Sequence, residues 1–461
     1  MFIVAIYTLS LVLIVSSFTS TTRNNPYRNH LCSNAASSKT NNSNNIAIPS
    51  TITTASKLPS TTISRRNILL FGMMTPISSA NAFSTASTTA SSMMTTNNYE
   101  SDSVVDDDRN TNTVAYKKID LPLNKEFGIT IPVACWYPVV NKPSYPSIKY
   151  NYRISLRRIG QLLVKWNFIP EFIARDFVLD PSLSSGRVVD GQNIPIPTST
   201  RISAAAGTKI VFLAHGFLGS RLDLAYIAED LAQQGFVCIA PEYPESLEAS
   251  YPRLDGLDRN IINDCLIQYI QRDTNTFIPK PIISYSAIGH SLGCSTVLRM
   301  GDNTWNRVLM GSGKAPEIPV SVGDECVGGR LLFISSINDG LTKFSGGIQI
   351  PNGYTMLQES QLRIRSSATT NEIIYQQQII PDRAALIFDR EDAPNHISYL
   401  SANTNDAMLS FLSPLLPVTN ALNIPVLDFD KYMESRDSKT TGNILKPLIS
   451  NFLLSAQPQN K

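Results

Sequence analysis

The sequence predicts an α/β fold with a mostly parallel central sheet and helices on both faces. Short apolar runs alternate with segments of helical periodicity from about residue 113 onward, which indicates strands joined by crossover helices. Strands connected in this way pair in parallel and bury both of their faces. A further observation is the stretch "AIGHSLGCSTVL", in which Ser291 lies between two glycines where a strand passes into a helix.

The composition is that of a globular protein with a charge imbalance at its N-terminal end. The 461 residues are 43% hydrophobic and 16% charged, with a formal net charge of +2. No Asp or Glu precedes Glu100, whereas six Lys or Arg residues precede residue 83. The rest of the chain therefore carries more acidic than basic residues, which excludes nucleic acid as a partner.

Cysteine and histidine spacing gives no sign of a metal site. None of the six cysteines forms a C-x-x-C pair, and only four histidines are present. We therefore expect no metal and no cofactor. The cysteines are expected to be buried free thiols, with one disulfide as the alternative in an oxidising compartment.

The first 112 residues are typical of targeting and linker sequence. Residues 1–17 resemble a signal peptide, because their apolar run is too short for a membrane span. Residues 18–82 have a Ser/Thr-rich, acid-free transit-peptide composition, and residues 64–82 within them resemble a twin-arginine signal. We expect residues 83–112 to be a disordered linker and residues 113–461 to form one domain.

Together these signals resemble the three-part presequence of thylakoid-lumen proteins in algae with complex plastids. In those presequences an aromatic residue, here Phe18, follows the first cleavage site. The predicted location is therefore the plastid, in the thylakoid lumen or at a membrane surface. A secreted or anchored protein with a disordered stalk is the alternative, but a stalk requires neither Arg65-Arg66 nor the A-x-A pattern of Ala80 to Ala82.

Strands and helices alternate through the body of the chain. Seven strands are predicted, at 129–140, 210–213, 236–243, 283–291, 307–313, 330–339 and 384–392. Helices are predicted at 223–235, at 259–271 and from Ser295 onward. The first helix has apolar residues at i, i+3, i+4 and i+7, and Gly235 stands where a C-cap belongs. In the second, Ile261, Ile262, Cys265 and Tyr269 are expected on the buried side.

Ser291 is the candidate nucleophile. Gly289 and Gly293 complete a G-x-S-x-G pattern, and His290 lies inside it, with a strand before and a helix after. This context is the nucleophile elbow, a sharp turn that projects a serine from the end of a sheet. A structural turn is the alternative interpretation. A serine hydroxyl also needs a base, a group that orients the base, and donors for the developing oxyanion.

Elimination leaves one histidine for the base. His30 lies in the predicted presequence, His215 ends an earlier strand, and His290 belongs to the elbow and is expected to point away from Ser291. His396 remains, and it follows the last predicted strand. This position satisfies the chain order serine, acid, histidine.

The acid and the oxyanion donors are assigned from their positions in the sequence. Asp339 ends a predicted strand between the serine and the histidine, where a carboxylate orients an imidazole, although a turn-forming role before a glycine is the alternative. The backbone N–H groups of Leu292 and Phe217 are the predicted oxyanion donors, with Leu218 in place of Phe217 as the alternative. Other acids are less suitable by position, namely Asp389, Asp392 and Asp324.

Four stretches carry a family resemblance. "AHGFLGSRLDLAYIAEDLAQQGFVCIAPEYPESLEASY", "GHSLGC", "RLLFISSIND" and "PNHISYLS" resemble the α/β-hydrolase superfamily over about residues 116–415. Within it, the sequence looks most like the platelet-activating-factor acetylhydrolase group and the related chlorophyllases, and a long insertion before the His-Gly strand is similar in position. The resemblance implies the α/β-hydrolase fold, with Ser291 as nucleophile, His396 as base, and Phe217 and Leu292 as oxyanion donors.

One feature departs from those groups. They usually carry the acid after the strand that follows the elbow helix, but the corresponding stretch here, "RVLMGSGKAP", has no carboxylate at the strand end. The acid is therefore expected at Asp339, the commoner position in the superfamily.

The insertion also suggests a lipid surface. Within residues 153–168, Ile159, Leu162, Leu163 and Trp166 share a helical face, with Arg153, Arg157, Arg158 and Lys165 nearby. Such a basic amphipathic helix binds a membrane surface, and a helix packed on the domain is the alternative. The C-terminal "NILKPLISNFLL" poses the same choice, with core packing favoured.

The function predicted from these features is a serine carboxylic-ester hydrolase with a lipid-like ester as substrate, of the 1-alkyl-2-acetylglycerophosphocholine esterase type. A chlorophyllase, which cleaves the phytyl ester of a pigment, is one alternative. A non-catalytic binding protein is another, as is a lyase or acyltransferase on the same fold, because fold alone does not fix function.

Overall fold

The structure is a computed structural model of the chain. The residues that it describes are 113–123, 127–139, 146–150, 152–155, 157–158, 162, 176–179, 188–197, 207–248, 251, 254–272, 278–317, 329–359, 364–366, 373–375, 380–402, 404–406, 409 and 435–455. The predicted signal peptide, transit region and linker, residues 1–112, lie outside them.

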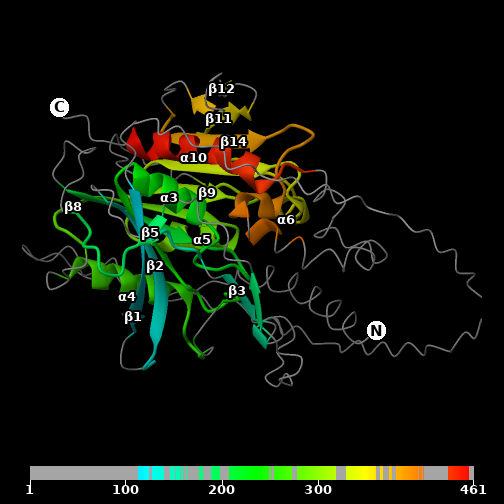
Figure 1. Cartoon of the computed structure of the whole chain (residues 1–461). Coiled ribbons are helices and arrows are strands. Elements are labelled where there is room, and N and C mark those ends of the chain that lie inside the picture. The colour runs from blue at the N-terminus through cyan, green and yellow to red at the C-terminus, as the bar shows by residue number, and fades with distance from the viewer. Residues whose placement is uncertain are drawn as a thin grey trace, which may run out of the picture. The chain divides into compact units, whose positions relative to one another are not determined.

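A sheet of ten strands forms the centre of the domain (Figure 1). The strands lie in the order β11-β14-β10-β9-β8-β6-β7-β2-β1-β5. All neighbours pair in parallel except that β2 is antiparallel to both β1 and β7. The bounds are β1 Thr113–Pro122, β2 Thr130–Val139, β5 Val188–Asp190, β6 Thr208–Ala214, β7 Phe236–Pro241, β8 Ile282–His290, β9 Asn306–Met310, β10 Leu331–Ser336, β11 Thr355–Gln358 and β14 Arg383–Phe388.

This strand order identifies the α/β-hydrolase fold. One antiparallel strand lies near one end of an otherwise parallel series, β6 and β7 exchange places, and β8 runs through a sharp turn into a helix. The predicted fold class is therefore confirmed.

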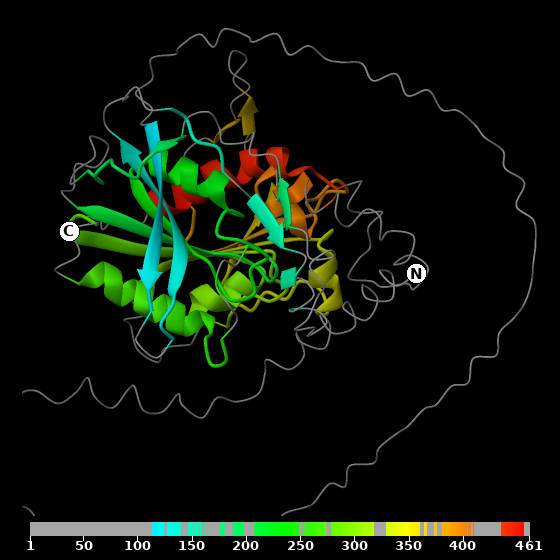
Figure 2. The ribbon, with the colours of Figure 1, turned by 60° about the horizontal axis from the view of Figure 1, so that its bottom comes forward.

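Helices cover both faces of the sheet, as the sequence predicts (Figures 1 and 2). On one face, α3 and α10 pack on apolar side chains of the strands, and on the other face α4 and α5 do so. Short helices follow β10 and β14 at their carboxyl ends. The bounds are α3 Ala225–Gln233, α4 Arg259–Gln271, α5 Leu292–Arg299, α6 Gly340–Phe344, η3 His396–Tyr399 and α10 Ser438–Leu454.

Local sequence explains where the predicted helices begin and end. α3 ends before Gly235, whose φ of 93° is the left-handed conformation that a C-terminal glycine adopts without strain. α4 begins after Asp258, whose side chain accepts a hydrogen bond from the N–H of Ile261. The C-terminal α10 packs its apolar side into the core, which confirms the favoured interpretation of "NILKPLISNFLL".

The buried side of α4 differs in part from the prediction. Ile262 is fully buried as expected, but Ile261, Cys265 and Tyr269 are only half-buried. The fully buried stripe runs through Ile262, Leu266 and Ile270, which recur every four residues on the face toward the sheet. The predicted residues all pack against this core, but periodicity alone did not show which stripe is fully buried, because apolar residues surround much of the helix.

The insertion contains strands that the sequence did not predict. β3 (Tyr152–Ser155) pairs with β4 (Asp176–Leu179) in a small antiparallel sheet, so Arg153 lies on a strand, while residues 157, 158 and 162 are helical. Arg158 is buried, and its guanidinium donates to the carbonyl of Pro244. Arg158 therefore packs within the protein, because a buried guanidinium needs an acceptor there. A second small sheet joins β12 (Ile364–Ser366) to β13 (Ile373–Tyr375).

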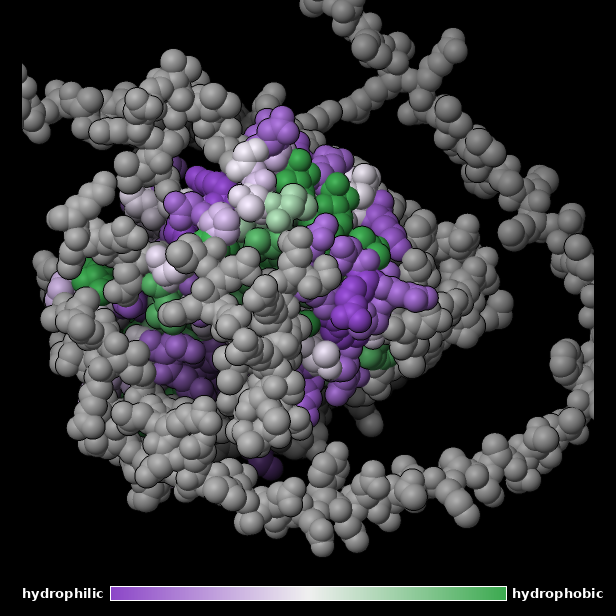
Figure 3. Space-filling model, turned by 90° about the horizontal axis from the view of Figure 1, so that it is seen from above, coloured by the Kyte–Doolittle hydropathy of each residue, from purple (hydrophilic) through white to green (hydrophobic). Residues whose placement is uncertain are grey.

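Hydrophobic exposure is limited among the described residues. Large exposed hydrophobic side chains lie on separate elements, at Ile283, Leu298, Ile337 and Met356. On the face seen in Figure 3, a small hydrophobic group is bordered by hydrophilic side chains. Among the helices of the described ranges, none combines the length and apolar character that crossing a membrane requires.

Candidate active site

Ser291 occupies a sharp turn between β8 and α5. Its φ of 54° and ψ of −119° are unusual for a residue with a side chain, and only Leu218 shares a positive φ among the described non-glycine residues. A Cβ atom at Gly293 would collide with the carbonyl of Ala214, and one at Gly289 would collide with the backbone of Gly293. Both glycines are therefore required by close backbone approach, and the turn is the predicted elbow.

The backbone of Ser291 is anchored while its hydroxyl is unengaged. Its N–H donates to the carbonyl oxygen of Met310 at 2.9 Å, which ties the turn to the end of β9. The Ser291 side chain makes no hydrogen bond with any residue that the structure describes. The Ser291–His396 contact therefore stays a prediction, and such contacts often tighten only when substrate binds.

Asp339 and His396 form a buried pair at the carboxyl ends of β10 and β14. Nδ1 of His396 lies 2.8 Å from Oδ2 of Asp339, and the imidazole is only 8% exposed. The other carboxylate oxygen, Oδ1, accepts from the N–H groups of Leu341 and Thr342 at 2.9 and 3.1 Å. The carboxylate is thus fixed by the start of α6 and holds the proton of His396 on Nδ1, leaving Nε2 as the acceptor.

The electrostatics of the pair keep the acid ionised. Burial acts to raise the pKa of Asp339, but the nearby His396, with its hydrogen bond, outweighs burial and lowers that pKa below its ordinary value. A carboxylate that is ionised at neutral pH can stabilise an imidazolium.

The loop that carries His396 is braced by side-chain amides. Oδ1 of Asn395 accepts from the N–H groups of Ile397 and Ser398 and caps η3. Nδ2 of Asn338, from the loop after β10, donates to the carbonyls of Glu391 and Ala393 at 2.8 and 3.0 Å. The acid loop and the histidine loop are therefore connected independently of the Asp339–His396 bond.

His290 contacts the candidate base, which the sequence did not predict. Its Nε2 lies 3.0 Å from the carbonyl oxygen of His396, and the two rings lie 4.8 Å apart. Burial, followed by the charge of His396, lowers the pKa of His290 to about 3, so the ring is neutral and donates through Nε2. The sequence motif Gly289-His290-Ser291 predicted only the elbow. It could not predict the contact of His290 with His396, because the two residues are far apart in the sequence.

The loop after β6 lies next to the elbow. A Cβ atom at Gly216 would lie 3.1 Å from the Cβ of Ser291, so Phe217, which follows Gly216, is close to the serine. Leu292 opens α5, where its N–H has no helical partner. The structure thus places both predicted oxyanion donors beside Ser291, and their role remains a prediction. Leu218, the alternative donor, has a φ of 60°.

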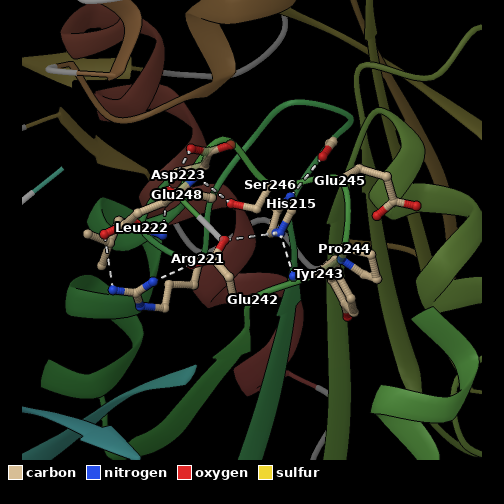
Figure 4. Close-up of polar contacts among 12 residues, drawn as sticks. His215, Arg221, Leu222, Asp223, Glu242, Tyr243, Pro244, Glu245, Ser246 and Glu248 are labelled. Carbon is tan, nitrogen blue, oxygen red and sulfur yellow. Dashed lines mark hydrogen bonds and ion pairs between the residues drawn. The ribbon is translucent and has the colours of Figure 1, made fainter. Parts of the chain in front are cut away.

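A buried charged cluster lies near the start of this loop, around His215 and Arg221 (Figure 4). The guanidinium of Arg221 bonds Glu242, and at 3.1 Å it also bonds Glu248. Nε2 of His215 accepts from the N–H of Tyr243 at 3.1 Å, which places its proton on Nδ1. Burial, followed by the charge of Arg259, lowers the pKa of His215 well below its ordinary value, so this ring is neutral.

The predicted site residues fall into groups. Ser291, Asp339 and His396 follow β8, β10 and β14, at one edge of the sheet. Asp389 is exposed, Asp392 pairs with Arg436, and Asp324 lies outside the described residues. Within the described ranges, no group of three or more His, Cys, Asp or Glu side chains is arranged to hold a metal ion.

Comparisons with known proteins give distant structural neighbours. No protein-family model matches the sequence, and the search of curated proteins found no match. A ferulic acid esterase from Streptomyces cinnamoneus is similar with a TM-score of 0.40 and 11% identity, over 75% of this chain and 89% of that one. A dienelactone hydrolase from Anabaena variabilis is similar with a TM-score of 0.29 and 13% identity, over 66% and 96%.

Proposed function

We propose that the protein is a serine carboxylic-ester hydrolase. The observation that carries this proposal is the buried bond between His396 and Asp339, at the sheet edge where an elbow presents Ser291. An imidazole whose Nδ1 is bound by a carboxylate keeps Nε2 as its acceptor, and this is the base that a serine hydroxyl needs. A non-catalytic binding protein would not require a strained serine at the same sheet edge as such a pair.

The proposed reaction passes through an acyl-enzyme. Oγ of Ser291 bonds to the ester carbonyl carbon while Nε2 of His396 takes the hydroxyl proton, and Asp339 stabilises the imidazolium. The N–H groups of Phe217 and Leu292 stabilise the carbonyl oxygen as it becomes an oxyanion. The carbon–oxygen bond to the alcohol then breaks, and the alcohol leaves with the proton from His396.

Water completes the cycle. His396 takes a proton from a water molecule, whose oxygen bonds to the acyl carbon. The bond to Ser291 breaks as His396 returns the proton to Oγ, and the carboxylic acid is released. His396 therefore takes up and returns the proton in both halves of the reaction.

The proposed substrate is a lipid-like ester. The support is the resemblance of the motifs to platelet-activating-factor acetylhydrolases, with the phytyl ester cleaved by chlorophyllases as the alternative. Of the basic residues proposed to face lipid in residues 153–168, Arg153 and Arg157 are exposed, whereas Arg158 is buried. Mass spectrometry of the products from a membrane lipid and pigment extract distinguishes a released short acid from released phytol.

The proposed location is the plastid, in the thylakoid lumen or at its membrane surface. The support is the three-part N-terminal sequence, with Arg65-Arg66 and the A-x-A pattern. Imaging a fluorescent protein fused to residues 1–90 tests this proposal, and fluorescence outside the plastid would contradict it.

The test of the reaction is covalent labelling. A fluorophosphonate probe bonds only to an activated serine, so we expect it to label the wild type and not Ser291→Ala, and ester hydrolysis to be lost in that variant. Ser295→Ala is a matched control, because Ser295 lies one turn along the same helix and its hydroxyl donates to the carbonyl of Leu292. Hydrolysis retained by Ser291→Ala would refute the mechanism.

A further inference from the structure

Arg259, the first residue of α4, reaches the loop that carries the proposed oxyanion donor. It is only 7% exposed. Its Nη1 donates to the carbonyl oxygen of His215 at 2.7 Å, and its Nη2 donates to the carbonyl oxygen of Gly216 at 3.1 Å. One guanidinium thus contacts two consecutive carbonyls directly before Phe217, and it shares the carbonyl of Gly216 with Nδ1 of His215, which lies 2.8 Å away.

The same guanidinium also reaches the elbow helix. Nη1 lies 3.2 Å from the hydroxyl oxygen of Thr296, which in turn donates to the carbonyl of Leu292 at 3.2 Å. Thr296 and Leu292 both belong to α5, whose first N–H is the second proposed oxyanion donor. Arg259 therefore connects the two segments from which the proposed oxyanion hole is built.

Two further contacts fix the guanidinium itself. Nε donates to the carboxylate of Glu245 at 3.1 Å, and the group lies over the ring of Tyr243, 4.4 Å from the centroid. Tyr243 also donates its N–H to His215. The guanidinium is thus held on one face by Tyr243 and along its edge by Glu245 and the two carbonyls, so its orientation is determined before any substrate binds.

Peptide planarity transmits this orientation to the donor. The carbonyl of Gly216 and the N–H of Phe217 belong to one trans peptide group, so they point in opposite directions within one plane. Fixing the carbonyl therefore fixes the direction of the N–H. A cation on the carbonyl oxygen also polarises the peptide and strengthens its N–H as a donor.

We propose that Arg259 is a positioning residue that aims and strengthens the Phe217 N–H as an oxyanion donor. This role rests on the proposed function. Arg259 does not touch the substrate, so its effect is expected in the transition state and not in substrate binding.

The chain offers a matched control in Arg330. Its guanidinium also donates to two carbonyls, those of Phe452 and Ile380, pairs with Asp382 at 2.7 Å, and lies over an aromatic ring, Phe452, at 4.4 Å. Arg330 directly precedes β10, at the opposite edge of the sheet from the active site. A loss of structure alone should therefore affect variants of Arg259 and Arg330 alike.

The experiment measures kcat and KM of the full chain with p-nitrophenyl acetate as the probe ester. We expect Arg259→Lys to lower kcat by about 10- to 100-fold with KM nearly unchanged, since a lysine reaches one carbonyl but not both. Arg259→Met should lose more. Arg330→Lys should lower the melting temperature but leave kcat within about two-fold of wild type.

A second variant covers the case in which Arg259→Lys does not fold. Glu245 is partly exposed, and Glu245→Gln removes only the charge that holds Nε. We expect a smaller loss of kcat, again with KM unchanged.

The outcomes separate the two proposals. Wild-type protein without Ser291-dependent turnover overturns the proposed function and the role of Arg259 with it. Active wild-type protein with full kcat in Arg259→Lys, or in Glu245→Gln if the first variant does not fold, overturns the role of Arg259 alone. An equal loss of kcat in Arg330→Lys also overturns it.

Discussion

At the scale of single residues, His396 is held from three directions. Asp339 binds its Nδ1, His290 donates to its carbonyl, and Asn395 caps the short helix that it begins. Only the first of these contacts sets the tautomer, because it alone involves the ring nitrogen. The carboxylate should therefore affect chemistry more than folding.

We predict that Asp339→Asn lowers kcat by about 10³- to 10⁴-fold. An amide oxygen can still accept the N–H bonds at the start of α6, so the helix cap survives. The amide cannot stabilise an imidazolium, and its N–H₂ favours the wrong tautomer of His396. Steady-state kinetics with p-nitrophenyl acetate, together with circular dichroism to establish folding, measure the two effects separately.

Asp389→Asn is the control for this prediction. Asp389 is exposed and was an alternative acid by sequence. We expect its kcat to match wild type. If Asp339→Asn keeps wild-type kcat, or if Asp389→Asn loses it, the assignment of the acid is wrong.

At the scale of elements, α4 shows how packing selects a helix face. Ile262 lies among the buried side chains of the sheet, and its neighbour Ile261 is half-buried. The two residues are chemically identical and differ by 100° around the helix, so only the position of the sheet distinguishes them.

We predict that Ile262→Ala lowers the free energy of unfolding by about 2–5 kcal/mol, because it removes fully buried methyl groups and leaves a cavity. Ile261→Ala should cost clearly less, since part of that side chain already contacts water. Urea denaturation of both variants measures the difference. Equal losses in the two variants would contradict the face assigned to α4.

At the scale of the whole molecule, the buried carboxyls of Asp223 and Glu248 couple folding to pH. Asp223 is fully buried, and burial with the charge of Glu242 raises its pKa to about 7, against the hydrogen bond from Ser220, which lowers it. The same two causes, in the same order, raise the pKa of Glu248 to about 8, against the opposing effect of Arg221. Both groups keep their protons in the folded chain at pH values where the unfolded chain has lost them.

Retained protons make stability fall as pH rises. Between pH 5 and 7 the folded state binds the Asp223 proton and the unfolded state does not, so the free energy of unfolding decreases with pH. His215 and His290, whose folded pKa values are lowered, contribute in the opposite direction. The slope of the wild-type free energy of unfolding against pH is therefore the sum of opposing contributions. A single-site variant is needed to isolate the contribution of one group.

We predict that Asp223→Asn gains stability relative to wild type by on the order of 1 kcal/mol per pH unit from pH 5 to 7, which is the value for one proton. Urea denaturation at pH 5, 6 and 7 measures this difference. Asp255 is exposed, so the free energy of unfolding of Asp255→Asn should change with pH in parallel with that of the wild type. Parallel profiles for Asp223→Asn would show that the proton is not retained.

The sequence by itself determined the elements and the chemical parts of the site. Periodicity along the chain gave the strands and helices, the glycines gave the elbow at Ser291, and elimination left His396. The strands, helices and elbow are local features, because each depends on residues within about one turn or one strand of one another, whereas His396 was found by comparing all four histidines of the chain.

Only the tertiary structure decided which distant groups meet. Pairing of β10 with β14 places Asp339 against His396 across 57 residues, while Asp389, much nearer in sequence, points to solvent. No sequence motif predicts the contacts of Arg259 and His290, because each joins a side chain to a backbone carbonyl on another element. A carbonyl is present at every residue, so the sequence cannot mark the one that a folded chain brings within reach.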